Sequence, residues 1–419
     1  MVIELGSLSG KCSCGRTHSL QVRQIVIESG ALGKLPQVLE ACGSFTAPVA
    51  ICDSNTRFAA QRVVSMLPGV QILMLDSDGL HADEHAVEQV EGGVPAGCDL
   101  LLAVGSGTIH DITRYVATQR KLPFVSVPTA ASVDGFVSTV AAMTWRGFKV
   151  TFPAVSPVAV VADSDIFANA PQRLNASGVA DLLGKYTALA DWKVASLLTG
   201  EYFCSRIAQL EMQALDTVTR MLPAIRVGER EACEQLMYAL LLSGLAMQMT
   251  GNSRPASGSE HHFSHLWEMH VLNPEVDALH GEKVGVGLAV ACEVYHGLLA
   301  HREQVRVVES YVGLPMEELQ QSFGNLYESI VKENTPDPVE NLDPETVELR
   351  MGEIYDIIAS LPTPKQVREL LHQAGCPETL EDLGLDPAIL YKSVRFSPLV
   401  RRRLTLMRVA TTLFEPFLF

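Results

Sequence analysis

The stretch LLLAVGSGTIHD, residues 100–111, passes directly from an apolar run into a turn that is rich in glycine. The apolar run predicts a buried strand, and a helix is expected after the turn. Gly105 and Gly107 let the backbone approach a ligand, and the N-terminus of the helix offers free amide hydrogens to a pyrophosphate. The match to the dinucleotide-binding pattern G-x-G-x-x-G is incomplete because His110 replaces the third glycine, so an ordinary tight turn is the alternative interpretation.

Short runs of β-forming residues alternate with helical segments between about residues 20 and 165. This alternation predicts a mostly parallel sheet with helices on its faces. The six runs span residues 24–28, 49–52, 70–75, 100–104, 124–127 and 158–162. After Pro171 apolar residues recur at helical spacing without convincing strands, over residues 178–198, 202–221 and 229–249. We therefore expect a Rossmann-like dinucleotide-binding α/β domain over residues 1–170 and an all-helical domain, which binds metal and substrate, over residues 171–419.

Composition limits the classes of partner. The 419 residues are 47% hydrophobic and 19% charged, and the net charge of -16 argues against nucleic acid or an anionic membrane. Nine scattered cysteines do not predict a disulfide framework in a chain of this length, so we expect a reduced, cytoplasmic setting. The N-terminus has no basic region followed by an apolar run, and the apolar residues 236–249 are too few to span a bilayer. They predict a buried helix.

A second loop, PTAASVDG at residues 128–135, follows the predicted strand 124–127 and is rich in small and hydroxyl residues. Ligands of open α/β sheets bind at the carboxyl ends of the strands, where this loop and the Gly105 loop converge. Asp53 ends another predicted strand, where its carboxylate is suited to accept hydrogen bonds from an adenosine ribose. The alternative for Asp53 is a helix cap or a turn residue.

A candidate metal site combines three distant parts of the chain. The stretch SGSEHHFSH, residues 257–265, is followed by His280 and preceded, about eighty residues earlier, by Asp181. One carboxylate and two imidazoles suit a first-row divalent cation, and three protein ligands leave a coordination position for substrate or water. An open site of this kind performs chemistry. The structural alternative for Asp181 is an ion pair with Lys185 at i,i+4.

The identity of the two histidine ligands is open at this point. On a helix, His261 and His265 project from one face, whereas His262 points about a quarter turn away. A break at Asn273-Pro274 lets the chain reverse and brings His280 back towards His261. Spacing alone does not say which two of His261, His265 and His280 bind the metal.

Two further groups attract attention and are interpreted as structural. Cys12, Cys14 and His18 lie close in sequence, but the C-x-C spacing is not that of a common zinc finger and a fourth ligand is missing, so we expect an incidental cluster. The basic run at residues 401–403 is typical of a solvated helix face or an interface.

Taken together, residues 105–111 and 129–135, the sequence GVAD at 178–181, and the motif of His261, His265 and His280 resemble the sn-glycerol-1-phosphate dehydrogenase family, bacterial branch. This family belongs to the superfamily of glycerol dehydrogenase, iron-dependent alcohol dehydrogenases and 3-dehydroquinate synthase. The resemblance extends from about residue 24 to residue 290 and implies a dehydroquinate synthase-like fold.

The resemblance also implies roles for individual residues. Asp181, His261 and His280 would hold the metal, with His265 and Asp134 on the substrate side and with Asp181 and His265 acting in catalysis. Together with Asp53, the residues expected to contact the nicotinamide cofactor are Gly105, Ser106, Gly107, Thr108, Asp111, Thr129, Ser132 and Ser138. The sequence departs from the family at Ser106, where many relatives carry glycine, and at His110, where an apolar residue is frequent.

The activity implied is the NAD(P)H- and metal-dependent, reversible reduction of dihydroxyacetone phosphate to sn-glycerol 1-phosphate, a step of phospholipid biosynthesis. The ligands do not choose among zinc, nickel and iron. Candidates for binding the substrate phosphate are Lys149, Arg254 and Lys283, and a homo-oligomer, with a dimer favoured, is expected. The alternatives are a polyol dehydrogenase acting on unphosphorylated dihydroxyacetone, a dehydroquinate synthase-like lyase, and a nucleotide-binding metalloprotein that acts as a sensor.

Overall fold

The computed structural model describes residues 3–417 and divides by internal contacts into two compact units. The sheet unit lies within Met1–Leu182 and Gln213–Ser253, and the helical unit lies within Leu183–Met212 and Arg254–Phe419. The expected division at residue 170 follows the change from strands to helices. Contacts instead group residues 171–182 and 213–253 with the sheet, so the chain leaves the sheet unit, returns to it and leaves again.

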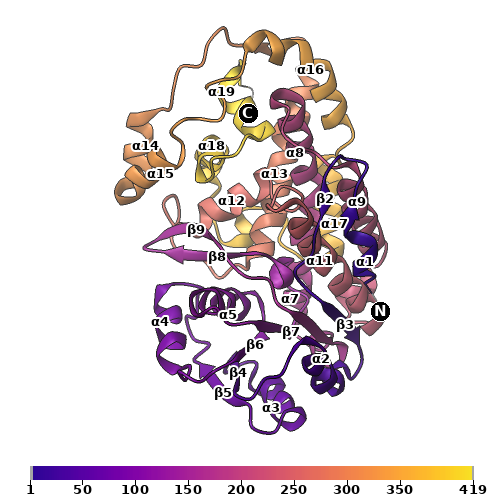
Figure 1. Cartoon of the computed structure of the whole chain (residues 1–419). Helices are drawn as coiled ribbons and strands as arrows, with labels where there is room; N and C mark the ends of the chain where they lie inside the picture. Colours follow the sequence, from indigo (N-terminus) through magenta and orange to yellow (C-terminus); the bar gives the residue numbers. More distant parts are fainter. Residues whose placement is uncertain (1–2, 418–419) are drawn as a thin grey trace. The chain divides into compact units, whose positions relative to one another are not determined.

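Six parallel strands form the central sheet in the order β3-β10-β7-β6-β4-β5 (Figure 1). Every strand expected from the sequence is present: β3 Gln24–Glu28, β4 Pro48–Asp53, β5 Gln71–Leu75, β6 Leu100–Gly105, β7 Phe124–Pro128 and β10 Ala159–Asp163. Gly105 is paired in register with Pro128, so the loops that follow β6 and β7 leave the same edge of the sheet. The predicted fold class, a parallel α/β sheet followed by a helical region, is confirmed.

Helices cover both faces of the sheet and explain why β6 is apolar throughout. Leu100, Leu102 and Val104 pack in one core with η1 (Ala31–Lys34), α2 (Leu35–Cys42) and α3 (Arg57–Met66). Leu101 and Ala103 face the other core, which is formed with α4 (Glu84–Gly93) and α5 (Gly107–Arg120). Parallel strands buried on both faces read as continuous hydrophobic runs, which is the pattern that the sequence has here.

The sheet unit also contains elements that the sequence analysis did not anticipate. Two antiparallel hairpins join β1 (Gly10–Lys11) to β2 (Thr17–His18) and β8 (Val140–Trp145) to β9 (Phe148–Pro153). The rings of Tyr115, Trp145 and Phe152 pack with centroids 5.2–5.6 Å apart and hold the second hairpin against α5. The remaining elements are α1 Leu5–Leu8, η2 Gly135–Val137, α6 Ser164–Phe167, α10 Leu222–Arg226 and α11 Arg230–Thr250, with α7 Gln172–Leu183 and α9 Ser205–Arg220 running from one unit into the other.

The helical unit is built around α8 (Lys185–Thr199), α12 (Ser259–Glu268) and α13 (His280–Ala300). The single amphipathic run expected over residues 178–198 is two helices, because α7 ends before Gly184 and α8 begins after it. The other elements are α14 Met316–Phe323, η3 Gly324–Leu326, α15 Tyr327–Glu333, α16 Pro344–Ala359, α17 Pro364–Ala374, η4 Glu381–Leu383, η5 Pro387–Ile389, α18 Leu390–Phe396, η6 Ser397–Val400, α19 Leu406–Leu413, and the two-residue strands β11 Arg306–Val307 and β12 Phe414–Glu415.

Two helices are apolar along most of their length. Residues 236–249 lie within α11 and are all buried except Tyr238, which is half-buried, so the sequence prediction of a buried helix is confirmed. Helix α13 has the length and composition of a membrane span, with a mean hydropathy of 1.3, but 72% of the apolar window is buried inside the protein. A mostly buried apolar helix is what the core of a globular unit requires.

Two glycines let helices approach the loop that follows β7 within the sheet unit. A Cβ at Gly178 of α7 would lie 2.0 Å from the carbonyl oxygen of Ala131. A Cβ at Gly244 of α11 would lie 2.8 Å from the carbonyl oxygen of Asp134. No side chain fits at these distances, so the loop packs directly against the backbones of the two helices.

His110 holds the loop that follows β6, which gives a physical reason for this unusual residue. The ring is buried, with Nδ1 2.9 Å from the carbonyl oxygen of Ser106 and Nε2 2.7 Å from Oγ of Ser126 on β7. The ring also packs edge-on against Phe136, with centroids 4.8 Å apart. Burial lowers the pKa of His110 to about 3, so the imidazole is neutral and ties the Gly105 loop to the neighbouring strand.

Replacing Gly178 should destabilise the sheet unit. In Gly178→Ala the new methyl group meets a carbonyl oxygen that is held by the sheet, and overpacking of this kind typically costs about 1–3 kcal/mol. Urea-induced unfolding would measure the loss. Gly352→Ala is the matched control, because Gly352 is an exposed position of α16 with nothing within 4 Å of a Cβ, and it should keep or slightly raise stability. Equal stability of the two variants would contradict the close approach.

His110 should make stability fall in acid. The unfolded chain binds a proton at His110 with a pKa near 6.5, whereas the folded chain does so only near pH 3. The contribution of His110 to the free energy of unfolding is therefore fully present above pH 6.5. It decreases as the pH drops towards 3, by about 2 kcal/mol between pH 8 and pH 5.

The variant His110→Asn keeps an amide donor for Ser106 but cannot bind that proton, so its unfolding free energy should fall less steeply with acid than that of the unchanged protein. His85→Asn, at an exposed position of α4, serves as the control and should leave the slope unchanged. Unfolding free energies measured in urea at several pH values would show whether the slopes differ. Parallel slopes for all three proteins would refute the role of His110.

Candidate functional site

The edge of the sheet at β6 and β7 carries most of the residues expected to bind the cofactor. The amide of Thr129 donates to the carbonyl oxygen of Gly105 at 3.0 Å, so the two loops lie against each other. A Cβ at Gly105 would lie 2.6 Å from the side chain of Ile109, and one at Gly107 would lie 3.0 Å from Val133. The glycines thus keep the backbone close to the start of α5, where amide groups point out of the helix end.

The hydroxyl and acidic residues of this edge have different surroundings. Oγ of Ser132 is buried without a hydrogen-bond partner among the described residues, as expected of a group that meets a ligand. Ser138 Oγ accepts from the amide of Val140 at 3.1 Å. Ser106 is the N-cap residue of α5, and Ser106, Gly107 and Thr108 are partly exposed.

Two acidic residues near the same edge already have protein partners. Asp111 forms an ion pair with Arg114, with Oδ1 and Nη1 2.6 Å apart. Oδ1 of Asp53 accepts from both the amide and the hydroxyl of Thr56 at 2.8 Å, just before α3 begins. Asp53 therefore acts as a turn residue, whereas Thr56 is the N-cap residue of α3, and a role of Asp53 with the ribose would rest on its second oxygen.

Asp134 and Asp181 meet inside the sheet unit. The amide of Asp134 donates to Oδ2 of Asp181 at 2.9 Å, and Ser243 of α11 donates to Oδ2 of Asp134, also at 2.9 Å. Both carboxylates are buried, and a buried carboxylate is costly unless donors or a cation satisfy it. A break at Gly184 separates the helix of Asp181 from that of Lys185, and Nζ of Lys185 donates to the carbonyl oxygen of Ala256 at 3.0 Å.

Three imidazoles gather in the helical unit. His261 and His265 lie on α12, and His280 is the first residue of α13, so the chain reverses between them as expected. The ring centroids are 5.4 Å apart for His261 and His280, 5.6 Å for His265 and His280, and 6.1 Å for His261 and His265. The neighbouring His262 is fully buried, and neither of its ring nitrogens has a hydrogen-bond partner among the described residues.

Two carboxylates, the fully buried Glu260 and the partly buried Glu268, set the direction of these rings. Nδ1 of His261 lies 2.8 Å from Oε1 of Glu260, and Nδ1 of His280 lies 2.7 Å from Oε1 of Glu268. An imidazole that donates its Nδ1–H to a carboxylate presents the lone pair of Nε2, which is the arrangement found around metal-binding histidines. The contact of His265 with Oε2 of Glu268 is longer, at 3.4 Å.

His265, Glu268 and His280 form a second possible metal site, because their ligand atoms lie within 4.8 Å of one another. Both oxygens of Glu268, however, already face imidazole nitrogens, so Glu268 is better suited to orient the rings than to bind an ion. Sequence analysis missed both orienting carboxylates. Glu260 stands inside the quoted motif, and Glu268 follows His265 at i+3, a spacing that places the two side chains on one helix face.

Burial keeps His265 neutral. Burial lowers the pKa of His265 to about 3, although Glu268 opposes the shift. Burial alone would raise the pKa of Glu260, but hydrogen bonds from His261, Thr187 and the amide of Gly258 lower it, so this carboxyl stays ionised. A neutral imidazole with an outward lone pair can accept a hydrogen bond or bind a cation.

The interpretation of the basic run as a solvated helix face is wrong for two of its three residues. Residues 401–403 follow η6 outside any helix, and only Arg402 is exposed. Arg403 donates from Nη1 to the carbonyl oxygen of Ser257 at 2.6 Å, and burial lowers its pKa to about 9. The charge of Arg401 contributes to the lowered pKa of His265, so Arg401 is an electrostatic neighbour of the histidine cluster. No spacing in the sequence indicates this.

The three basic side chains expected as candidates for binding the substrate phosphate differ in burial and in the partners that they already have. Arg254 is buried, with Nε 2.6 Å from Oε1 of Glu201 and Nη1 2.7 Å from the carbonyl oxygen of Leu404. Lys283 is buried and donates from Nζ to the carbonyl oxygen of Ala278 at 2.8 Å. Lys149 lies on β9 of the sheet unit and is half-buried.

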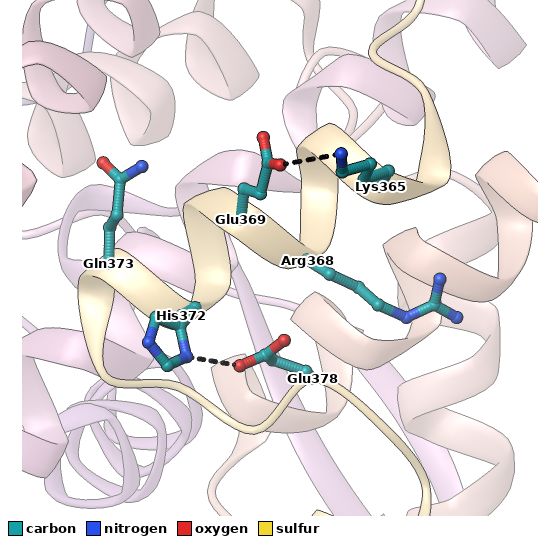
Figure 2. A pocket seen from close by; sticks show the side chains of 6 residues that line it. All are labelled: Lys365, Arg368, Glu369, His372, Gln373 and Glu378. Atoms are coloured by element: carbon teal, nitrogen blue, oxygen red, sulfur yellow. Dashed lines mark hydrogen bonds and ion pairs between the residues drawn. The ribbon is translucent and has the colours of Figure 1, made fainter.

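A surface hollow of about 420 Å³ lies elsewhere, along α17 (Figure 2). Four of its side chains form two pairs, with Lys365 3.8 Å from Glu369 and His372 2.7 Å from Glu378 (Figure 2), and Arg368 pairs with Glu293 outside the hollow. None of the expected site residues lines it. These solvent-exposed pairs are typical of an ordinary helix surface.

Comparisons with known proteins agree with the motifs. The family model described as iron-containing alcohol dehydrogenase matches residues 26–171. Glycerol-1-phosphate dehydrogenase (NAD(P)+) of Geobacillus thermodenitrificans (strain NG80-2) is 34% identical over 398 residues, which cover 93% of this chain and 92% of the relative. The protein of the same name from Bacillus licheniformis is 32% identical and covers 96% and 92% of the two chains.

Among solved structures, a probable glycerol dehydrogenase from Sinorhizobium meliloti 1021 is similar, with a TM-score of 0.62 over 93% of this chain and 92% of that one. At 18% identity this likeness establishes the fold alone. The curated relatives go further, because their identity extends over nearly the full length of both sequences. The resemblance seen in the motifs is confirmed, and this chain belongs to the glycerol-1-phosphate dehydrogenase (NAD(P)+) family.

Proposed function

We propose that this protein catalyses the reversible, NAD(P)H-dependent reduction of dihydroxyacetone phosphate to sn-glycerol 1-phosphate. The observation that carries the proposal is the cluster of His261, His265 and His280, whose Nδ1 atoms lie against Glu260 and Glu268 and whose Nε2 atoms therefore point away from those carboxylates. Membership of the family supplies the substrate class, since the relatives are named glycerol-1-phosphate dehydrogenase.

Asp181, His261 and His280 are proposed to hold one divalent metal ion. Each offers one ligand atom of a type that zinc, nickel and iron accept, and the ring orientation of both histidines suits this role. The second-sphere carboxylates support the choice of His261 and His280 over His265, whose contact with Glu268 is longer. When bound, the metal would supply Lewis-acid polarisation of the ketone, and the nicotinamide would supply the hydride.

The proposed cofactor site is the edge of the sheet at β6 and β7. Amide groups at the start of α5 would bind the pyrophosphate, and the small residues Gly105 to Thr108 allow it to approach. Thr129, Ser132 and Ser138 would contact the nicotinamide half, and the buried, unpartnered hydroxyl of Ser132 fits this role. Asp53 would bind the ribose through the oxygen that Thr56 does not use, and Asp111 would act beside Arg114.

On the substrate side, His265 and Asp134 would handle the hydroxyl groups. His265 is neutral, so its Nε2 would accept a hydrogen bond from a substrate hydroxyl and pass a proton to or from water. Asp134 is held by Ser243, which fixes its carboxylate at the C-terminal edge of the sheet. Both groups orient the substrate so that its carbonyl carbon meets the hydride donor.

Arg401 is the proposed ligand of the substrate phosphate, in place of Arg254. The guanidinium of Arg254 is already engaged by Glu201, whereas Arg401 is coupled to His265 and Glu268 of the histidine cluster. A guanidinium binds phosphate with two parallel hydrogen bonds and gives strong discrimination against a substrate that lacks the group.

A cytoplasmic, homo-oligomeric enzyme, with a dimer favoured, completes the proposal. None of the nine cysteines, all of which lie in the described part of the chain, forms a disulfide, and this suits a reducing compartment. Zinc, nickel and iron remain equal candidates for the metal.

Removal of a proposed ligand should abolish both metal binding and turnover. For Asp181→Asn and His280→Ala we expect reduction of dihydroxyacetone phosphate to fall by at least about 10³-fold, because polarisation of the ketone is lost. Metal content per chain, measured by mass spectrometry, should fall with it while circular dichroism stays unchanged. His296→Ala, at a half-buried histidine of α13 outside the cluster, is the control and should retain both. A metal-free His280→Ala protein with full activity would rule out the proposed site.

Substrate choice should depend on the phosphate and on Arg401. NADH oxidation with dihydroxyacetone phosphate should exceed that with dihydroxyacetone by about 10²-fold or more in kcat/KM, since a charge-assisted phosphate contact contributes about 1.5–3 kcal/mol and several act together. Arg401→Gln should raise KM for the phosphorylated ketone and leave the rate on the bare ketone almost unchanged. Chiral analysis of the product should give the sn-1 enantiomer.

Arg402→Gln, at the exposed neighbouring position, is the matched control for Arg401→Gln. Equal rates on both ketones would favour the polyol dehydrogenase instead. Turnover of a substrate without net oxidation of NADH would favour a dehydroquinate synthase-like lyase, and a protein that binds nucleotide and metal without any turnover would favour a sensor.

A further inference from the structure

The hairpin formed by β1 and β2 brings together three residues that the proposed function does not use. The amide of Cys12 donates to the carbonyl oxygen of Arg16 at 2.9 Å, and the amide of Gly15 donates to that of Cys12 at 3.0 Å. Gly15 has φ of +86°, a left-handed conformation that favours glycine. This tight turn places the thiols of Cys12 and Cys14 beside the ring of His18, with the three ligand atoms within 4.8 Å of one another.

We propose that Cys12, Cys14 and His18 bind a second divalent metal ion of the thiophilic kind, such as zinc, in a structural site separate from the proposed catalytic one. The sequence alone favours an incidental cluster, because the C-x-C spacing is uncommon. The proximity of the three ligand atoms in the structure favours a metal site instead. Binding would release the two thiol protons to solvent and requires no oxidant or reductant.

The distances suit tetrahedral coordination. Sγ of Cys14 lies 3.5 Å from Nε2 of His18. With metal–sulfur and metal–nitrogen bonds of about 2.3 and 2.0 Å, neighbouring ligand atoms of a tetrahedron are roughly 3.5–3.8 Å apart. The two atoms are thus already spaced as ligands of one ion.

The orientation of His18 is set by the protein interior. The ring is buried, and its Nδ1 lies 2.8 Å from the carbonyl oxygen of Met249, near the end of α11. Donation of Nδ1–H to this carbonyl leaves the lone pair of Nε2 directed at the thiols, as in zinc sites whose histidine is fixed by an outer partner.

The same corner is linked to the cofactor side of the sheet unit. The amide of Gln21, three residues beyond the hairpin, donates to Oε1 of Gln248 at 2.7 Å. The Nε2 group of Gln248 donates to the carbonyl oxygen of Val137 at 2.5 Å and to Oγ of Ser156 at 2.8 Å. A metal in the hairpin would therefore stiffen the segment that supports the loop ahead of Ser138.

Cobalt substitution tests the site without relying on activity. The proposed catalytic ligands are one carboxylate and two imidazoles, so only the hairpin site supplies thiolates and gives a thiolate-to-cobalt absorption band. We expect this band in the full-length, reduced protein loaded with Co²⁺, and its loss in Cys12→Ser/Cys14→Ser. The control Cys42→Ser/Cys98→Ser replaces two cysteines of the same unit and should keep the band. The zinc content of the hairpin variant should fall by one equivalent.

A second measurement covers the case in which the hairpin variant does not fold. In the unchanged protein, zinc should protect two thiols from a thiol reagent, and a chelator should expose them again. X-ray absorption of zinc-loaded His280→Ala, which lacks the proposed catalytic ligand, should show at least two sulfur neighbours.

Several outcomes would overturn the proposal: a cobalt band that is absent from the reduced protein, a band that persists in Cys12→Ser/Cys14→Ser, or a zinc shell made of nitrogen and oxygen only. Isolation of the reduced protein with no zinc-dependent thiol protection would do the same. None of these readouts depends on turnover, so a failure of the proposed dehydrogenase activity would be distinguished from a failure of the hairpin site.

Discussion

The arrangement of the helical unit depends on two carboxylates that are held inside it, Glu260 and Glu268. Each accepts a hydrogen bond from an imidazole, and Glu260 is further held by Thr187 and the amide of Gly258. Ionised side chains are expensive to bury unless hydrogen bonds or opposite charges satisfy them. Because a histidine ring is among the partners of each carboxylate, the contacts that stabilise the carboxylates also fix where the ring nitrogens point.

In the sheet unit, the loop after β7 is held in place mainly by close contact with helix backbones. The loop after β7 lies on Gly178 of α7 and Gly244 of α11, and Asp134 within it contacts Asp181 and Ser243 of the same two helices. The loop after β6 is tied to β7 through His110. The edge of the sheet is therefore rigid before any ligand arrives, which lowers the entropic cost of binding a long cofactor.

Much of the parallel sheet can be predicted from the sequence, because the spacing of apolar residues indicates which segments are buried. All six strands of the parallel sheet were found, since each is buried on both faces and reads as an apolar run. The hairpin β8–β9 was missed although Arg146-Gly147 marks its turn, because its strands are only half-buried and their alternation is weak. The break at Gly184 was missed because helical spacing continues on both sides of it.

For the candidate site, the sequence supplied residue types and the structure supplied their surroundings. The histidines were named, but the orienting role of Glu268 and the burial of Arg403 depend on contacts between segments far apart in the chain. His110 appeared only as a departure from the family pattern, and its reason lies in a bond to Ser126 on the next strand. The grouping of residues 213–253 with the sheet has no local signal at all.

That return of the chain bears on how the protein is made. A ribosome releases the six strands early, yet the helix that carries Ser243 and Gly244 is synthesised only after a further segment, residues 183–212, which belongs to the other unit. A nascent chain that ends at residue 182 has the strands and Gly178 of α7, but it lacks α11, the second of the two helices on which the loop at Asp134 lies. The sheet unit is thus completed late in translation, and the first part of the helical unit emerges before the sheet unit can finish folding.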